Sequence, residues 1–270
     1  ETAKGIDEVP DRAVLEIKNM SYKYDGVESY TLKNINMTVK PGEHIAIVGE
    51  NGAGKTTLIK LLMRLYDVTE GEIDFGGTDI RKFTTAQYRN KISAVFQDYQ
   101  MYAAPLGDNV AMDKNSPYTD DEIKAALGKA DFTARLAKMK NGLDTEIMRE
   151  FNEDGTLLSG GEAQKVAVAR MFLKGGRPAI SILDEPSSAL DPVAEYTLNT
   201  NMMANAGDST IIFISHRLST TRDADRIYMF AHGEIVEEGT HEELMAMNGE
   251  YRNMFEKQAH YYKQQIADAV

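Results

Sequence analysis

One glycine-rich stretch contains the residue types that bind a chain of phosphates. Residues 49–57 read GENGAGKTT and fit the pattern G-x-x-x-x-G-K-[ST]. Glycines let the backbone curl so that successive N–H groups converge on phosphate oxygens, and the N-terminus of a following helix adds positive potential. A glycine-rich turn that binds nothing is the alternative, which the strand pattern before the stretch and the helix pattern after it disfavour. The predicted loop comprises Gly49, Glu50, Asn51, Gly52, Ala53, Gly54, Lys55, Thr56 and Thr57.

Within this loop, two side chains are suited to the charges of a nucleoside triphosphate. The Lys55 ammonium would reach the β- and γ-phosphates, and the Thr56 hydroxyl would bind Mg²⁺. The stretch therefore predicts a nucleotide site.

Four short apolar runs each end in a residue that could take part in chemistry. They read HIAIV, ISAVF, ISIL and TIIFI, at residues 44–48, 92–96, 180–183 and 210–214. Near-continuous apolar strands are typical of a parallel sheet buried on both faces, and ligands bind beyond the carboxyl ends of such strands. We therefore predict one site built from four distant segments, which end in Gly49, Gln97, Asp184 with Glu185, and Ser215 with His216.

The third run is followed by two adjacent carboxylates, Asp184 and Glu185. Asp184 at the strand end suits the ligand shell of Mg²⁺, and Glu185 suits a general base for an attacking water. The alternative is that both acids decorate the first turn of a helix, where the helix dipole favours negative charge. The glycine-rich loop upstream favours the catalytic interpretation.

Three further residues are weaker candidates for the same site. His216 could hydrogen-bond the γ-phosphate and detect its loss, and Gln97 gains weight from its position at the same sheet edge. Tyr24, in SYKYDG, could stack on adenine. For His216 and Tyr24, a role in packing is the competing interpretation.

A second glycine-rich helix start lies further along the chain, where residues 155–165 read GTLLSGGEAQK. Ser159 followed three residues later by Glu162 predicts a capping box, which marks the start of a helix. The capping box does not explain Gly160 and Gly161, which leave backbone N–H groups accessible to an anion. A phosphate-binding helix start without a lysine predicts a half-site. A second molecule would complete it, in a head-to-tail dimer with two-fold symmetry.

The rest of the pattern supplies elements to position these residues. Alternating segments predict strands at residues 14–24 and 31–39, and helical spacing is present at 55–66, 120–132 and 160–173. The C-terminal segment from His241 predicts one or two helices. Residues 1–13 are polar, contain Pro10 and are predicted to form a linker or loose arm.

The amino-acid composition excludes several classes of protein and of site. Of 270 residues, 42% are hydrophobic and 27% are charged, as in an ordinary globular protein. Lys and Arg total 30 against 42 Asp and Glu, and the formal net charge of −12 argues against broad electrostatic binding to nucleic acid. The absence of cysteine excludes a disulfide framework and a Cys-based metal site. No apolar stretch approaches the roughly 18 residues typical of a membrane-spanning helix.

Six motifs, in order and spacing, resemble the ATP-binding cassette of ABC transporters, and the exporter branch in particular. They are GENGAGKTT, FQ at residues 96–97, LSGGE, ISILDEP, SALD at residues 188–191, and ISH. The resemblance implies an α/β fold: a P-loop NTPase core with a parallel sheet, an antiparallel β subdomain near the N-terminus and an inserted α-helical subdomain. It places the cassette at residues 14–255, its helical subdomain at about 98–165, and a helical extension at 256–270.

The same resemblance implies an ATPase that uses ATP and Mg²⁺ and powers transport by membrane domains absent from this chain. The implied location is the cytoplasmic face of the cell membrane. The implied partners are a second nucleotide-binding domain and the membrane domains, with no nucleic acid.

The resemblance also implies a role for each candidate residue. Catalysis would involve Lys55, Glu185 and His216, and Mg²⁺ would be bound by Thr56, Gln97 and Asp184. Asp191 would lie at the dimer seam, and Tyr24 would stack on adenine. Glu162 departs from the Gln that exporters usually carry at its position. The ATP held by the partner would be contacted by Ser159, Gly160, Gly161 and Glu162.

Two other functions compete with a transport ATPase. One is a soluble ABC-type ATPase that acts on DNA ends, chromosomes or ribosomes. Members that act on chromosomes carry a long coiled coil within the cassette and those that act on ribosomes usually carry two cassettes, and this sequence shows neither feature. The other is a nucleotide-binding regulator or scaffold with little hydrolysis, which the presence of Glu185 and His216 disfavours.

Overall fold

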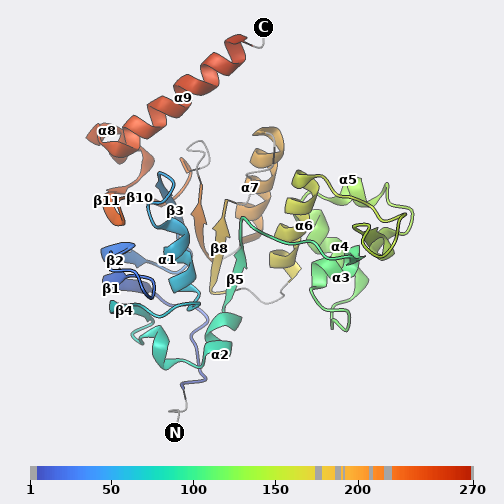
Figure 1. The fold of residues 1–270 in the computed structure, drawn as a ribbon, viewed down its shortest axis with the longest axis horizontal. Coiled ribbons are helices and arrows are strands. Elements are labelled where there is room, and N and C mark those ends of the chain that lie inside the picture. The colour runs from blue at the N-terminus through green and yellow to red at the C-terminus, as the bar shows by residue number, and fades with distance from the viewer. Residues whose placement is uncertain are drawn as a thin grey trace. The chain divides into compact units, whose positions relative to one another are not determined.

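The structure, a computed structural model, describes residues 5–173, 178–185, 190, 192–206, 209–215 and 221–268 (Figure 1). The chain divides into two compact units. The first comprises residues 1–92, 178–184 and 208–270, and the second comprises residues 93–177 and 185–207. His216 and Asp191 lie outside the described residues.

A mainly parallel sheet forms the centre of the first unit. Its strands follow the order β11-β10-β3-β9-β8, with β5 next in the order and beginning at the last residue of this unit. Neighbours from β10 to β8 are parallel, and β11 is antiparallel to β10. The bounds are β3 His44–Gly49, β5 Ile92–Val95, β8 Ile180–Asp184, β9 Thr210–Ile214, β10 Arg226–Ala231 and β11 Glu234–Gly239.

The near-continuous apolar sequence of the central strands explains their position. Every residue of β8 and β9 is buried, including Ser181, and β3 is buried from Ile45 onward. A strand covered on both faces needs apolar side chains at successive positions rather than at alternate ones. The predicted parallel sheet is therefore confirmed.

Strand β11 lies at the edge of this sheet in the part of the chain that the structure describes. Its sequence, EIVEEG, alternates between exposed and half-buried positions. The Glu237 carboxylate accepts hydrogen bonds from the backbone N–H groups of Glu250 and Tyr251, at 2.5 and 3.0 Å. These N–H groups belong to the first turn of a helix, where a carboxylate is favoured by the dipole and satisfies donors that lack a helical partner.

A second, antiparallel sheet of the first unit has the order β2-β1-β4. Its strands are β1 Leu15–Tyr22, β2 Leu32–Val39 and β4 Glu70–Phe75. Both pairs shift register near Asn19, whose φ is 48°. Within the segment predicted as an arm, Ile6 pairs with the chain at Phe83 through hydrogen bonds of 2.8 and 2.9 Å.

Helix α1 (Lys55–Leu62) ends before the periodic pattern that predicted a helix to residue 66. Arg64 takes a φ of 52°, and the N–H groups of Arg64 and Leu65 bond back to the carbonyls of Leu61 and Lys60, both at 2.8 Å. This is the bonding pattern of a Schellman cap, in which the left-handed residue is usually glycine. The Arg64 guanidinium also donates to the carbonyl of Phe83 at 2.6 Å. This contact helps hold Arg64 in the left-handed conformation. Because the residue is not a glycine, the sequence does not mark the end of the helix.

Among the residues that the structure describes, the first unit has four more helical segments. They are the 3₁₀ turn η1 Ile80–Lys82, α2 Thr85–Asn90, α8 His241–Met247 and α9 Glu250–Asp268. The last two confirm the prediction of C-terminal helices, and α9 is the long red helix in Figure 1.

The second unit is mainly helical, as the resemblance implied. Helices α3 and α4 both pack against α6, which is buried at half of its 14 positions. The bounds are α3 Leu106–Ala111, α4 Asp120–Lys129, α5 Thr133–Leu136, α6 Gly160–Leu173 and α7 Pro192–Ala206, with the 3₁₀ turn η2 Gly142–Asp144 and the short strands β6 Ala104–Pro105 and β7 Glu146–Ile147. Across the described ranges, none of the helices has the length and apolar character needed to cross a membrane.

We expect the core of the first unit to depend on the buried face of α1. Leu58 is fully buried, whereas Leu65, just beyond the helix, is 43% exposed. Leu58→Ala should reduce the free energy of unfolding by about 2–5 kcal/mol, because it removes buried apolar surface and leaves a cavity. Leu65→Ala should change it by less than about 0.5 kcal/mol. Urea unfolding of both variants checks this, and equal losses would contradict the assignment of the buried face.

Candidate functional site

The loop between β3 and α1 has the backbone geometry that a phosphate site requires. Gly49, Gly52 and Gly54 take φ values of 147°, 81° and 100°, which side chains other than hydrogen rarely allow. The N–H of Ala53 bonds to the carbonyl of Glu50 at 3.2 Å and closes a turn. At Gly49 a Cβ would lie 2.2 Å from the carbonyl oxygen of Phe230 on β10. This glycine is therefore required both by its φ and by the close approach of the neighbouring strand.

A buried lysine lies inside this loop. Lys55 is only 6% exposed, and its side-chain ammonium donates to the carbonyls of Gly49 and Glu50 at 2.8 and 2.9 Å. A buried ammonium is costly unless its protons are hydrogen-bonded. These bonds therefore hold a positive charge at the carboxyl end of β3 and keep the loop wrapped around it. Glu50, Asn51, Gly52 and Thr56 are exposed.

The residues suited to Mg²⁺ in the first unit are Thr56 and Asp184. Thr56 is exposed in the first turn of α1, and Asp184 is 3% exposed at the end of β8, which packs against α1. Within the described ranges, no group of three or more His, Cys, Asp or Glu residues could hold a metal by itself. Mg²⁺ is commonly bound by one or two protein oxygens together with substrate phosphates and water. A hydroxyl and a carboxylate from adjacent elements fit that mode of binding.

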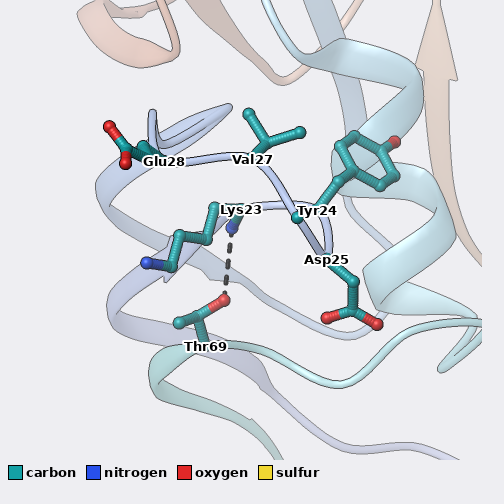
Figure 2. Close-up of a pocket in the computed structure, with 7 residues that line it drawn as sticks. Lys23, Tyr24, Asp25, Val27, Glu28 and Thr69 are labelled. Atoms are coloured by element: carbon teal, nitrogen blue, oxygen red, sulfur yellow. Dashed lines mark hydrogen bonds between the residues drawn. The ribbon is translucent and has the colours of Figure 1, made fainter.

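Tyr24 lies beside a hollow of about 400 Å³ that is lined by residues 23–28 and Thr69. Figure 2 shows its ring pointing from the loop toward α1, and the backbone N–H of Lys23 bonding to the Thr69 hydroxyl at 3.2 Å. The Tyr24 hydroxyl lies 3.0 Å from the Thr57 hydroxyl. Tyr24, the predicted aromatic residue, is thus hydrogen-bonded to Thr57 at the end of the glycine-rich loop.

Two further tyrosines surround this ring. Tyr22 and Tyr66 meet Tyr24 edge to face, with ring centroids 5.0 and 5.7 Å away. Burial, together with the neighbouring Tyr24 and Tyr66, raises the pKa of the Tyr22 hydroxyl. Tyr24 therefore packs in an aromatic cluster and also lies next to the phosphate loop, so the two interpretations from the sequence are compatible. Tyr22 could have been found from the sequence, because it is two residues from Tyr24 in an alternating strand.

In the second unit, the start of α6 confirms the predicted capping box. The Ser159 N–H donates to the Glu162 carboxylate at 2.9 Å, and the Glu162 N–H donates to the Ser159 hydroxyl at 3.2 Å. Ser159 and Gly160 are exposed, so this helix start faces solvent. Arg135 Nε lies 2.8 Å from the other Glu162 oxygen. The two groups form an ion pair, but their geometry is not that of a hydrogen bond. Glu162 is thus an acidic residue whose charge is partly balanced from α5.

The segment that follows Gln97 is attached to the same helix. Gln97 itself is exposed. The Tyr99 hydroxyl donates to the Gly160 carbonyl at 2.9 Å, and the Arg170 guanidinium donates to the Gln100 carbonyl at 2.8 Å. Burial raises the pKa of Tyr99 and lowers that of Arg170. The segment after Gln97 is therefore held by two residues of α6, Gly160 at the start of the helix and Arg170 near its end.

Glu185 is partly exposed and has an unusual backbone conformation. Its φ is 51°, in the left-handed region that few residues other than glycine adopt. Its carbonyl accepts a hydrogen bond of 3.2 Å from the Gln164 amide of α6. Residues in sparsely populated backbone regions are concentrated at functional sites.

Comparison with known families accounts for this set of motifs. The family model for the ABC transporter matches residues 32–188, which is more than half of the chain. The chain belongs to the ABC transporter family.

The chain is similar to the nucleotide-binding part of exporters in particular. It is 38% identical over 252 residues to an ATP-dependent lipid A-core flippase of Salmonella typhimurium, covering 93% of this chain and 42% of the flippase. It is 36% identical over 249 residues to the corresponding flippase of Haemophilus influenzae, covering 92% of this chain and 41% of that protein. The chain thus spans less than half the length of the curated relatives it matches.

A solved structure agrees with this assignment. The fold matches a bacterial Atm1-family ABC exporter, determined with ATP bound, with a TM-score of 0.88 and 34% sequence identity. The match covers 96% of this chain and 44% of the exporter chain. The resemblance to the ABC exporter cassette and the α/β fold predicted from it are confirmed.

Four residues of this ABC cassette were not identified from the sequence, although each contacts a candidate site residue or the segment beside one. They act through contacts that are distant along the chain, so no local motif marks them. They are Tyr99, Arg135, Gln164 and Arg170.

We expect Gly49 to be less replaceable than Gly52 in this ABC cassette. Gly49→Ala would place a methyl group against the Phe230 carbonyl, whereas a Cβ at Gly52 meets nothing within 4 Å. Gly52→Ala should reduce the free energy of unfolding by about 1–2 kcal/mol through its positive φ alone. Gly49→Ala should cost clearly more, because the β10 backbone must move. Urea unfolding of the two variants checks the order, and a larger loss at Gly52 would contradict it.

Proposed function

We propose that this chain is the ATP-binding and hydrolysing domain of an ABC exporter. Two copies, or one copy and a related cassette, would dimerise head to tail around two ATP molecules and power translocation by membrane domains. The observation that carries the proposal is the buried Lys55 ammonium inside a loop bent by three glycines, at the carboxyl end of a parallel strand. The similarity to exporters over 93% of the chain supports the coupling to transport.

Binding of ATP would use groups from the first unit. The loop N–H groups and the Lys55 ammonium would bind the β- and γ-phosphates, because they concentrate positive charge at the start of α1. Tyr24 would stack on adenine, with its hydroxyl fixed near Thr57. When bound, Mg²⁺ would neutralise phosphate charge. Thr56, Asp184 and Gln97 would hold it.

Hydrolysis would depend on Glu185. As general base, its carboxylate would accept a proton from the water that attacks the γ-phosphate. His216 would hydrogen-bond the γ-phosphate and respond to its release. Phosphate release would then let the two copies separate.

The partner's nucleotide would be bound by the start of α6. The capping box engages the N–H groups of Ser159 and Glu162, and Ser159 and Gly160 are exposed and so accessible to another molecule. Such a helix start favours an anion. Asp191 would lie at the dimer seam, and Gln97 would lie near the contact with membrane domains. The domain would therefore work at the cytoplasmic face of the membrane.

The replacement Glu185→Gln tests the hydrolytic role. Turnover should fall by about 100- to 10,000-fold, because Gln cannot accept the proton from water. ATP-bound dimers should accumulate in the variant. Steady-state phosphate release and size-exclusion chromatography with light scattering measure the two effects. Unimpaired turnover would remove Glu185 from the role of base, and strong stimulation of turnover by DNA or ribosomes would favour a soluble ABC-type ATPase instead.

The trans role of the α6 helix start is tested with a matched pair of cap variants. Ser159 and Thr119 both cap helices of the second unit in complete capping boxes. Ser159→Ala and Thr119→Ala should each cost about 1 kcal/mol of stability, because each leaves helix N–H groups without a partner. In the Glu185→Gln background, only Ser159→Ala should weaken the ATP-dependent dimer, by at least about tenfold, or roughly 1.4 kcal/mol.

Sedimentation of the two double variants at several protein concentrations measures this dimer constant. A dimer equally strong in both variants would contradict the trans contact. An equally weakened dimer in both would assign the effect to stability of the second unit.

A further inference from the structure

A buried amide on α6 contacts the backbone of the proposed base. Gln164 is only 1% exposed, and its Nε2 donates to the Glu185 carbonyl at 3.2 Å. The two residues are 21 positions apart in the sequence and both belong to the second unit. Leaving a side-chain amide unpaired in the interior is costly. A buried glutamine on a helix otherwise rich in Ala and Val therefore needs a specific partner, and the Glu185 carbonyl supplies one.

The conformation of Glu185 explains what that contact can do. A φ of 51° is unfavourable for a residue with a side chain, so the surroundings must maintain it. The next residue is Pro186, and a residue before proline normally prefers the extended region. The hydrogen bond from Gln164 acts on the same residue, because it fixes the direction of the Glu185 carbonyl. The direction of the carbonyl and that of the side chain are linked through the backbone dihedrals of one residue.

We infer that Gln164 is a positioning residue, which holds the Glu185 backbone in the left-handed conformation and so aims its carboxylate at the attacking water. This inference rests on the proposed function, in which Glu185 is the general base. Gln164 touches neither substrate nor metal in this account. Its effect is therefore expected on the rate of the chemical step and not on the binding of ATP. A misplacement of a catalytic group by about 1 Å can cost about 100-fold in rate.

Two variants remove the contact by opposite means. Gln164→Met keeps nearly the length of the side chain but has no N–H donor, and Gln164→Asn keeps the amide but is too short to reach. Both should lower kcat for ATP by about 10- to 100-fold, with KM for ATP changed by less than about twofold. If Gln164 served packing alone, Met should be tolerated and only Asn, which leaves a void, should be harmful.

A matched control is available at the next position of α6. Lys165 forms an ion pair with Asp131 at 2.6 Å and donates to the Asp131 carbonyl at 3.2 Å. Lys165→Met therefore removes a tertiary contact of the same helix, but this contact is with Asp131 and not with Glu185. We expect its kcat to stay within about twofold of the unmodified chain.

The decisive measurement combines each variant with Glu185→Gln. If Gln164 acts through the Glu185 carboxylate, adding Gln164→Met to Glu185→Gln should change the residual turnover by less than about twofold. A loss that multiplies with that of Glu185→Gln would assign Gln164 a separate role and overturn the inference. Normal kcat in both Gln164 variants would also overturn it, as would the failure of both to fold, which would place Gln164 in the core alone.

The same set of variants separates this inference from the proposed function. Unimpaired turnover of Glu185→Gln would contradict the base itself. An inactive Glu185→Gln together with fully active Gln164 variants would contradict only the positioning role.

Discussion

The buried ammonium of Lys55 is the constraint on which the candidate site depends. A positive charge that is almost fully buried must be surrounded by oxygen acceptors, and the carbonyls of Gly49 and Glu50 provide two of them. The loop can turn these carbonyls inward only if its glycines adopt positive φ angles. The lysine, the glycines and the position of β10 beside Gly49 therefore form one interdependent arrangement.

Helix α6 has the corresponding role in the second unit. Half of its positions are buried, and alanine and valine occupy most of these. Several of its polar side chains contact segments far away in the sequence. Near its start, Glu162 and Gln164 connect it to α5 and to the residue after β8. Near its end, Arg170 binds the carbonyls of Gln100 and Asn109. A single helix thus joins the proposed trans contact, the proposed base and the segment after Gln97.

Local patterns predicted the elements and motifs, and failed where distant contacts decide the outcome. The parallel strands, the glycine-rich turn between β3 and α1 and the capping box at Ser159 depend on neighbouring residues, so the sequence alone was sufficient. The end of α1 was predicted four residues late, because Arg64 takes a left-handed conformation that its contacts with η1 and the residue after it support. The partners Gln164 and Glu185 are 21 residues apart, and a pairing at that distance leaves no periodic signal.

The acidic edge strand β11 has a consequence for how copies of this chain can meet. An unpaired strand edge can recruit a strand from another chain, which leads to aggregation. Three of the six residues of β11 are glutamates, and Glu237 is already engaged by the first turn of α9. Glu234 and Glu238 form exposed ion pairs with Lys33 and Arg226, at 4.0 and 3.5 Å. Charged side chains on an edge strand disfavour pairing with a strand of a second molecule, so continuous intermolecular sheets are disfavoured. The charged side chains of β11 thereby lower the tendency of copies of this chain to aggregate through this edge.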